Sequence, residues 1–123
     1  MKPAPAILIV DDNPANMKLL SFLLSARGYE VRTSADADEA LAALACFQPQ
    51  LILMDLQLPG VDGLTLTRRL KADAAYRHIT VVAVTASAMK GDEQRAMEAG
   101  CDGYITKPID TRAVPQLIAS FLR

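Results

Sequence analysis

The sequence predicts an α/β fold in which five strand–helix units build one parallel sheet. Short apolar or β-branched runs alternate along the chain with amphipathic segments of helical length, and the turns between them are short. The run Leu51–Met54 is apolar throughout, which is typical of a central strand covered by helices on both faces. With 123 residues, of which 51% are hydrophobic, the chain is expected to form a single domain over 1–123.

The first unit has a clear strand, helix start and helix end. The strand is predicted at Ala6–Val10. Asn13 followed by Pro14 favours a helix start, because Asn is a good N-cap and Pro suits the first helical position. Gly28 is typical of the residue just after a helix end. The face of this helix that should be buried is formed by Met17, Leu20 and Leu24.

The second unit begins with a short strand at Glu30–Thr33. Asp36 and Glu39 have the spacing of a capping box, in which two side chains satisfy free backbone N–H groups at a helix start. Pro49 ends the segment. The buried face of the helix is predicted to consist of Ala40, Leu41 and Leu44.

The third and fourth units follow the same order. After Leu51–Met54, the stretch Pro59-Gly60-Val61-Asp62-Gly63 is predicted to be a loop, followed by a helix. A β-branched run predicts the fourth strand at Thr80–Val84, and the next helix is expected from Gly91 to Ala99, terminated by Gly100. The core side of the earlier helix should carry Leu64, Leu66 and Leu70.

The last unit contains one conflict. The fifth strand is predicted at Gly103–Thr106, and Asp110 is a helix-cap signal. Pro115 follows shortly, and a proline inside a helix removes a hydrogen bond and clashes with the preceding turn. The regular helix is therefore expected to begin near Val114, later than the cap signal indicates.

Composition excludes several classes of function. Charged residues make up 22% of the chain and the formal net charge is −1, so no broad basic field is available for nucleic acid or an anionic membrane. No apolar run approaches the roughly 18 residues of a membrane helix, and no signal peptide is visible, so a cytoplasmic protein is expected. Arg68, Arg69 and Lys71 are interpreted as a solvated helix face.

Two cysteines and one histidine do not form a metal site of their own. Cys46 and Cys101 lack CxxC spacing, and both are predicted to be small buried hydrophobes in a reducing compartment. His78 is the only histidine and is predicted to lie on the surface before the fourth strand.

Polar residues stand at the carboxyl ends of four of the predicted strands. They are Asp11 with Asp12, then Asp55, Thr85 and Lys107. In an open parallel sheet these ends share one edge, which is where ligands bind. Converging carboxylates repel one another unless a cation neutralises them, and hard oxygen ligands suit Mg²⁺. The pattern therefore predicts a magnesium-dependent phosphoryl site, in which a backbone carbonyl such as that of Gln57 completes the ligand set.

Each residue type has a function in such a site. Asp55 is the best candidate for a nucleophile that forms an aspartyl phosphate. Lys107 supplies a positive charge to a phosphate oxygen, while the Thr85 hydroxyl and the Ala86 backbone N–H donate hydrogen bonds. Pro108 allows a cis peptide bond at low cost, which would turn Lys107 into the site.

The sequence resembles the receiver domains of bacterial two-component response regulators over essentially its whole length. The motifs are Asp11-Asp12, Leu53-Met54-Asp55 with Leu58-Pro59-Gly60 and Asp62-Gly63, then Thr85-Ala86, and finally Lys107-Pro108. Asn13, Asn16-Met17-Lys18 and the stretch from Ala88 to Glu93 look most like stand-alone receivers of the DivK type.

The resemblance implies a doubly wound, flavodoxin-like or CheY-like (βα)5 fold with strand order 2-1-3-4-5. It implies Mg²⁺ held directly by Asp12, Asp55 and the Gln57 carbonyl, with Asp11 acting mainly through water. The phosphoryl group would come from a phosphohistidine on a sensor histidine kinase or a histidine phosphotransfer protein. Thr85 would then move toward the phosphoryl group and Tyr104 would rotate inward behind it.

The resemblance also implies an output surface. Downstream proteins would bind the face of the fourth helix, fifth strand and fifth helix, with Arg95, Tyr104 and Arg112 as candidates. Pro115 perturbs the last helix on the face where such domains often dimerise, so a monomer or weak homodimer is expected. No effector domain is expected within the chain, and catalysis should be limited to self-phosphotransfer and slow autodephosphorylation, without turnover of a substrate.

Other functions fit the residues less well. A phosphohydrolase with an aspartate nucleophile usually has an acid two residues later, where this chain has Gln57. A nucleotide-binding loop needs glycines or hydroxyls, whereas Asp11 and Asp12 repel phosphate. A docking module of the same fold that is not phosphorylated, and a receiver excised from a hybrid histidine kinase, both remain open.

Overall fold

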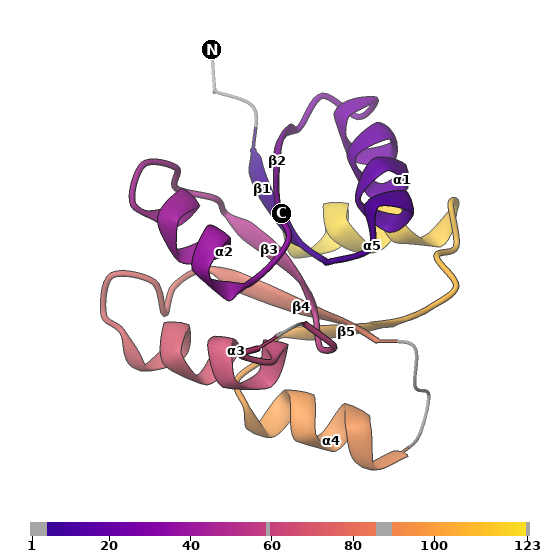
Figure 1. Ribbon diagram of the computed structural model, residues 1–123. Helices are drawn as coiled ribbons and strands as arrows, with labels where there is room; N and C mark the ends of the chain where they lie inside the picture. Colours follow the sequence, from indigo (N-terminus) through magenta and orange to yellow (C-terminus); the bar gives the residue numbers. More distant parts are fainter. Residues whose placement is uncertain (1–4, 59, 86–89, 123) are drawn as a thin grey trace.

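The computed structural model describes residues 5–58, 60–85 and 90–122, and shows strands and helices in strict alternation (Figure 1). The strands are β1 (Ala6–Val10), β2 (Glu30–Ser34), β3 (Leu51–Asp55), β4 (Thr80–Thr85) and β5 (Gly103–Thr106). The helices are α1 (Pro14–Ser25), α2 (Ala37–Leu44), α3 (Gly63–Ala72), α4 (Lys90–Glu98) and α5 (Ala113–Phe121). All ten predicted elements are confirmed in this order, and most of their ends lie within two residues of the predictions. Two boundaries were wrong: α2 ends at Leu44, well before Pro49, and Gly63 is the first residue of α3, although it was predicted to belong to the loop.

The five strands form one parallel sheet in the order β2-β1-β3-β4-β5. Neighbouring strands end almost level with one another. Val10 pairs with Met54, Asp55 pairs with Val84, and Thr85 pairs with Thr106. Because the strands are parallel and their ends align, the residues that follow them gather along a single edge of the sheet.

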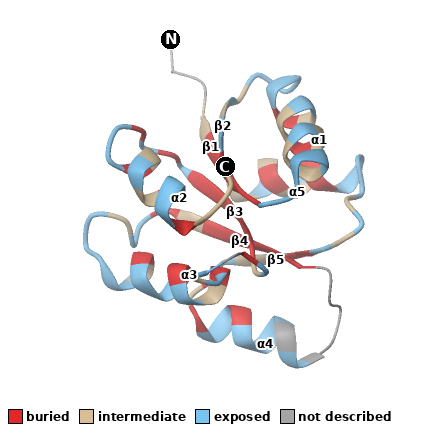
Figure 2. Ribbon diagram, viewed as in Figure 1, coloured by how far each residue is buried: buried red, intermediate tan, exposed pale blue. Residues whose placement is uncertain are grey.

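Helices cover both faces of the sheet, which is why the central strands have no exposed face (Figures 1 and 2). One face packs against α1 and α5, and the other packs against α2, α3 and α4. Alternate residues of each strand point to opposite faces, so β3 contributes to both cores and all five of its residues are buried. The α1–α5 core includes Leu20, Leu24, Val114 and Ile118; the other core includes Ala40, Leu44, Leu66, Leu70 and Ala96.

The predicted helix caps are formed as expected. The Asn13 side chain accepts hydrogen bonds from the backbone N–H groups of Ala15 and Asn16 at 2.9 and 3.2 Å. Asp36 accepts a hydrogen bond from the Glu39 N–H at 2.8 Å, and the Glu39 carboxylate accepts one from the Ala35 N–H at 3.2 Å. These contacts satisfy backbone donors that have no partner within the helix, and so they fix where α1 and α2 begin.

Helix α5 begins one residue before the predicted start. Its first residue is Ala113, so Pro115 lies in the first turn, where its missing N–H leaves no hydrogen bond unmade. The Asp110 side chain accepts hydrogen bonds from the N–H groups of Arg112 and Ala113 at 2.9 and 3.0 Å. These bonds lower the pKa of the Asp110 carboxyl. The cap signal and the proline are therefore compatible, because the chain turns at Asp110 before the regular helix starts.

The prediction for the cysteines is half right. Cys101 is buried beside Thr67, and burial raises the pKa of its thiol. The prediction of a buried Cys46 is wrong: this residue is exposed in the turn after α2, with its Sγ 3.7 Å from the Ala43 carbonyl oxygen. Its neighbour Phe47 fills the core position. Periodicity does not separate these two apolar residues, because the helix ends between Leu44 and Cys46.

The prediction for His78 is confirmed, because this residue is exposed in the turn before β4. The prediction of a solvated face on α3 is right for Arg68 and Arg69, which are exposed, and wrong for Lys71. The Lys71 side chain is only 20% exposed; its Nζ lies 2.9 Å from Asp102 Oδ2 and donates a hydrogen bond to the Ile79 carbonyl at 2.7 Å. Within residues 5–58, 60–85 and 90–122, no helix is both long and apolar enough to span a bilayer.

Candidate functional site

Four strand ends bring the predicted site residues together at the carboxyl edge of the sheet. Asp11 follows β1, Asp55 is the last residue of β3, Thr85 is the last residue of β4, and Lys107 follows β5. The aligned register of the parallel strands places them side by side, although Asp55 and Lys107 are separated by 52 positions in the chain.

Asp11, Asp12 and Asp55 form an acidic cluster. One carboxylate oxygen of each lies within 4.8 Å of the corresponding oxygens of the other two. Asp11 and Asp55 are 1% and 2% exposed, whereas Asp12 is exposed and lies at the mouth of the cluster. Three acids this close repel one another strongly when two of them are shut off from water, so the cluster favours a cation.

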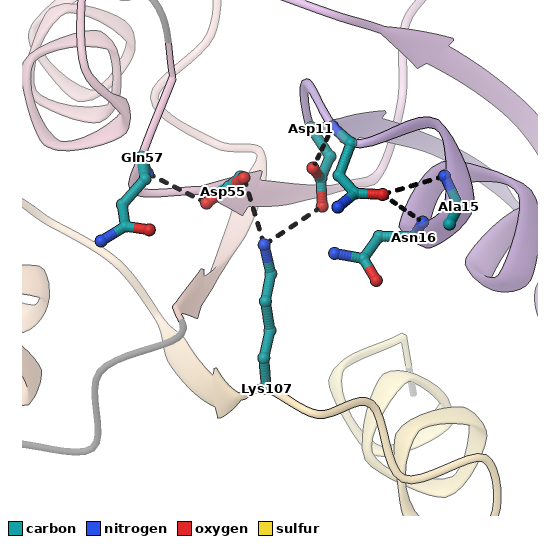
Figure 3. Close-up of polar contacts among 7 residues, drawn as sticks. Asp11, Ala15, Asn16, Asp55, Gln57 and Lys107 are labelled. Carbon is teal, nitrogen blue, oxygen red and sulfur yellow. Dashed lines mark hydrogen bonds and ion pairs between the residues drawn. The ribbon is translucent and has the colours of Figure 1, made fainter.

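Lys107 reaches across the sheet edge to the two buried acids (Figure 3). Its Nζ donates a hydrogen bond to Asp55 Oδ2 at 3.3 Å and lies 3.7 Å from Asp11 Oδ2. The peptide bond between Lys107 and Pro108 is cis, as the X–Pro pair allowed. One ammonium group therefore neutralises part of the charge of two carboxylates.

The Asp11 carboxylate is only half satisfied. Its Oδ1 accepts a hydrogen bond from the Asn13 N–H at 2.8 Å, but its Oδ2 is buried and has no hydrogen-bond partner. Burial and the nearby charge of Asp55 raise the pKa of the Asp11 carboxyl, despite the opposing effects of the Asn13 N–H and Lys107. A buried carboxylate oxygen that accepts no hydrogen bond and faces two further carboxylates fits a hard divalent cation such as Mg²⁺.

The Asp55 carboxylate is held at both oxygens. Its Oδ1 accepts a hydrogen bond from the Gln57 N–H at 2.9 Å, and its Oδ2 faces Lys107. The Gln57 side chain is exposed and points away from the carboxylate (Figure 3). The Asp55 carboxylate is thus fixed in orientation at the end of the central strand, which is what a nucleophile or a metal ligand requires.

Thr85 and Tyr104 lie on the same face of the sheet. Tyr104 pairs with Ala83, two residues before Thr85, and strand alternation points Ala83 and Thr85 to the same side. Thr85 is buried, and Tyr104 is half-buried against the core shared with α2, α3 and α4. Ala86, whose backbone N–H was predicted to donate to a phosphate oxygen, lies outside the described residues.

Two backbone contacts in the site were not predicted from the sequence. The Asn13 N–H orients Asp11 and the Gln57 N–H orients Asp55, each donating to the carboxylate two residues before it. Every residue except proline carries such a donor, so residue identity holds no signal for them. Asp is nevertheless favoured where a side chain caps its own turn in this way, which is the one available hint.

The raised pKa of Asp11 predicts the effect of removing its charge. The folded chain binds the Asp11 proton more tightly than the unfolded chain, so ionised Asp11 lowers stability at neutral pH. This cost disappears as the pH falls through the raised pKa toward the ordinary aspartate value. In EDTA at pH 7, Asp11→Asn is therefore expected to raise the free energy of unfolding.

Urea denaturation in EDTA across pH 4–8 measures this effect. The control is Asp38→Asn, which removes an exposed acid from α2 and should change stability by less than about 0.5 kcal/mol. An Asp11→Asn protein no more stable than the wild type at pH 7 would contradict the electrostatic account of the cluster.

Chemically, the site combines a fixed carboxylate, a place for a cation, an ammonium group and a buried hydroxyl. Phosphoryl transfer depends mainly on positioning and on stabilising negative charge, and these groups supply both.

Comparison with known proteins finds close relatives over nearly the whole chain. A profile of the response regulator receiver domain family matches residues 7–119. The polar-differentiation response regulator DivK of Brucella anthropi is 49% identical over 117 residues, which cover 95% of each chain.

Solved structures agree with this similarity. The receiver domain of a sensor histidine kinase from Pseudomonas aeruginosa, solved with a magnesium ion coordinated in its active-site cleft, is 31% identical with a TM-score of 0.87. The match covers 97% of this chain and 98% of that one. The chemotaxis response regulator CheY4 of Vibrio cholerae has a TM-score of 0.90 over 96% and 98% of the two chains, and at 24% identity it shows the fold alone.

Proposed function

The chain belongs to the response regulator receiver domain family. On that premise we propose that Asp55 is the residue of this chain that accepts the phosphoryl group. Proteins of this family are signalling switches in two-component systems and phosphorelays, and they act with histidine kinases or phosphotransfer proteins and with downstream effectors. The observation that carries the assignment is the buried Asp55 carboxylate at the end of β3, held by the Gln57 N–H and by Lys107.

The transfer is a displacement at phosphorus. A carboxylate oxygen of Asp55 forms a bond to the phosphorus of a phosphohistidine on the partner, while the bond from phosphorus to the imidazole nitrogen breaks. The imidazole nitrogen takes the electron pair of the broken bond, and the ring gains a proton from water so that it leaves as neutral imidazole. Asp55 reacts as the anion, so no proton has to be removed from it.

Mg²⁺ is the cofactor that the acidic cluster fits. Asp12, Asp55 and the Gln57 carbonyl would hold it directly and Asp11 mainly through water. The buried Asp11 Oδ2, which has an ion pair with Lys107 but no hydrogen bond, supports this assignment. When bound, the ion neutralises the carboxylates and the oxygens of the incoming phosphoryl group.

The remaining residues stabilise the phosphorylated form. Lys107 lies close enough to Asp55 to pair with a phosphoryl oxygen, and the Thr85 hydroxyl and Ala86 N–H donate to the others. Movement of Thr85 toward the phosphoryl group leaves room for Tyr104 to turn inward. Their positions on one face of neighbouring strands support this coupling. Catalysis is limited to this self-phosphotransfer and to slow loss of the phosphoryl group by hydrolysis.

The switch is read by another protein at the surface of α4, β5 and α5. Arg95, Tyr104 and Arg112 are the candidate contacts there, and the chain works as a monomer or weak homodimer. Because the histidine kinases that donate the phosphoryl group use ATP, we place the protein in the cytoplasm.

Intact mass spectrometry tests the proposal. With Mg²⁺ and acetyl phosphate or phosphoramidate, the wild type is expected to gain about 80 Da, the mass of one phosphoryl group. Asp55→Asn should gain nothing, and EDTA should abolish the gain. Asp38→Asn, which removes an exposed acid on α2, should react like the wild type.

Two results would contradict the assignment. Modification of Asp55→Asn to the same extent as the wild type would place the acceptor elsewhere. A wild type that takes no phosphoryl group from either small donor or from a phosphorylated histidine kinase would leave only the unphosphorylated docking module.

A further inference from the structure

We propose that Gly63 is a positioning residue for phosphoryl transfer. Because Gly63 has no side chain, the first turn of α3 packs directly against the peptide that follows Asp55. The inference deepens the proposed function and rests on it. Gly63 belongs to the stretch that the sequence predicts to be a loop, and nothing in the chemistry of the site described above depends on it.

The evidence is the space around Gly63. A Cβ built on this residue would lie well under 3.0 Å from the carbonyl oxygen of Asp55. Real Cβ atoms essentially never approach another heavy atom so closely. The built Cβ would also lie 2.9 Å from the Leu56 Cα. Both are backbone atoms, so no side chain can rotate away to make room. Even an alanine at position 63 must displace the backbone.

Backbone conformation does not explain this glycine. The glycines with positive φ are Gly28, Gly60 and Gly100, and Gly63 is not among them. Gly63 is the first residue of α3, and its conformation there is open to any residue. What position 63 requires is the absence of a side chain.

One hydrogen bond ties the first turn of α3 to the chain just after β3, and two more bonds order the turn itself. The Asp62 side chain accepts from the Thr65 N–H at 2.8 Å, and the Gly63 N–H donates to the Leu56 carbonyl at 3.3 Å. The Thr67 hydroxyl donates to the Gly63 carbonyl at 2.8 Å, and Thr67 is fully buried. The ordered turn is thus joined to the segment after β3 at Gly63 itself, so a shift at Gly63 acts directly on the Leu56 peptide.

A displacement at this point would reach the reacting groups. The Asp55 carbonyl and the Leu56 Cα lie between the Asp55 side chain and Gln57, whose N–H donates to Asp55 Oδ1 at 2.9 Å. Gln57 is also the residue proposed to offer its carbonyl to Mg²⁺. Pushing the peptide away from α3 changes the position of this carbonyl and of the carboxylate together. Sub-ångström errors of this kind are costly in metal sites and in phosphoryl transfer.

The chain offers a matched control for testing Gly63. Gly91 also lies in the first turn of a helix, α4, and is exposed, with no atom within 4 Å of a Cβ built on it. Gly63→Ala and Gly91→Ala therefore make the same chemical change at similar helical positions. Only Gly63→Ala places a methyl group against the backbone at the end of β3.

The experiment measures Mg²⁺ affinity by calorimetry and the initial rate of phosphorylation by acetyl phosphate at saturating Mg²⁺. For Gly63→Ala we expect Mg²⁺ to bind about tenfold to a hundredfold more weakly, as when supporting residues of a metal site are replaced. The rate at saturating Mg²⁺ should also fall. Gly91→Ala should match the wild type in both measurements. Denaturation in EDTA reports stability separately.

A purely structural glycine gives a different result. In that case Gly63→Ala is less stable in EDTA, while the folded protein keeps the Mg²⁺ affinity and rate of the wild type, and this outcome overturns the proposal. If Gly63→Ala does not fold, the Mg²⁺ affinity of Thr67→Val is measured instead. This substitution removes the hydrogen bond from the Thr67 hydroxyl to the Gly63 carbonyl without adding bulk. An affinity weakened about threefold or more supports the inference, and an unchanged one overturns it.

Failure of the proposed function would be visible in the wild type. A wild type that binds no Mg²⁺ and takes no phosphoryl group refutes the function itself, and the role of Gly63 falls with it. A wild type that does both, beside a Gly63→Ala protein that does both equally well, refutes only the inference about Gly63.

Discussion

Replacing Lys107 with methionine is expected to slow phosphorylation of Asp55 by about a hundredfold to a thousandfold, the usual effect of removing one group aimed at developing negative charge. The Lys107 ammonium lies 3.3 Å from Asp55 Oδ2, and the Lys107 side chain is only 18% exposed. Methionine keeps most of the length and volume of the side chain but carries no charge. The substitution therefore removes the ammonium from beside two buried carboxylates, where a charge acts more strongly than in water.

The same substitution should strengthen Mg²⁺ binding. Lys107 is a cation beside carboxylates that would hold another cation, and the two positive charges repel each other. A slower reaction combined with tighter Mg²⁺ binding is a result that general disruption of the site cannot produce, since disruption would weaken both.

The measurements are the initial rate with acetyl phosphate at saturating Mg²⁺ and the Mg²⁺ dissociation constant. Lys18→Met, which removes an exposed lysine on α1, serves as the control and should leave both unchanged. A Lys107→Met protein that is phosphorylated at the rate of the wild type would show that this ammonium does not stabilise the transferred group.

The second large effect concerns stability. Leu20→Ala is expected to lower the free energy of unfolding by about 2–5 kcal/mol, because it removes buried methyl groups and leaves a cavity. Leu20 is 1% exposed and belongs to the core between the sheet and the helices α1 and α5. The free energy of unfolding of a native domain is only about 5–15 kcal/mol, so the loss expected for Leu20→Ala is a large share of the total stability.

The matched control lies on the same helix. Phe22 is 72% exposed, and Phe22→Ala should change stability by no more than about 0.5 kcal/mol, although it removes more apolar surface than Leu20→Ala. Chemical denaturation followed by circular dichroism compares the two variants. Equal losses at both positions would contradict the assignment of the α1 faces.

Local signals explain why the elements were predictable. Asn13 and Asp36 cap helices through their own side chains, and Gly28 and Gly100 end helices with positive φ, so a few neighbouring residues decide each boundary. The prediction failed for Cys46, where the helix had already ended and the choice between Cys46 and Phe47 depended on the shape of the core. Non-local packing made that choice.

The sequence by itself determined the alternation of strands and helices and the placing of an acid, a hydroxyl or a lysine at the ends of four of the five strands. These properties depend on periodicity and on which residue follows a run. The strand order entered only through the family resemblance, because periodicity does not specify which strands pair. Only the tertiary structure decided that Lys107 faces both Asp11 and Asp55, that Asp11 Oδ2 accepts no hydrogen bond, and that Gly63 touches the peptide after Asp55. The reason is physical: distances of a few ångström between residues far apart in the chain are set by how helices pack on the sheet, and no local pattern encodes them.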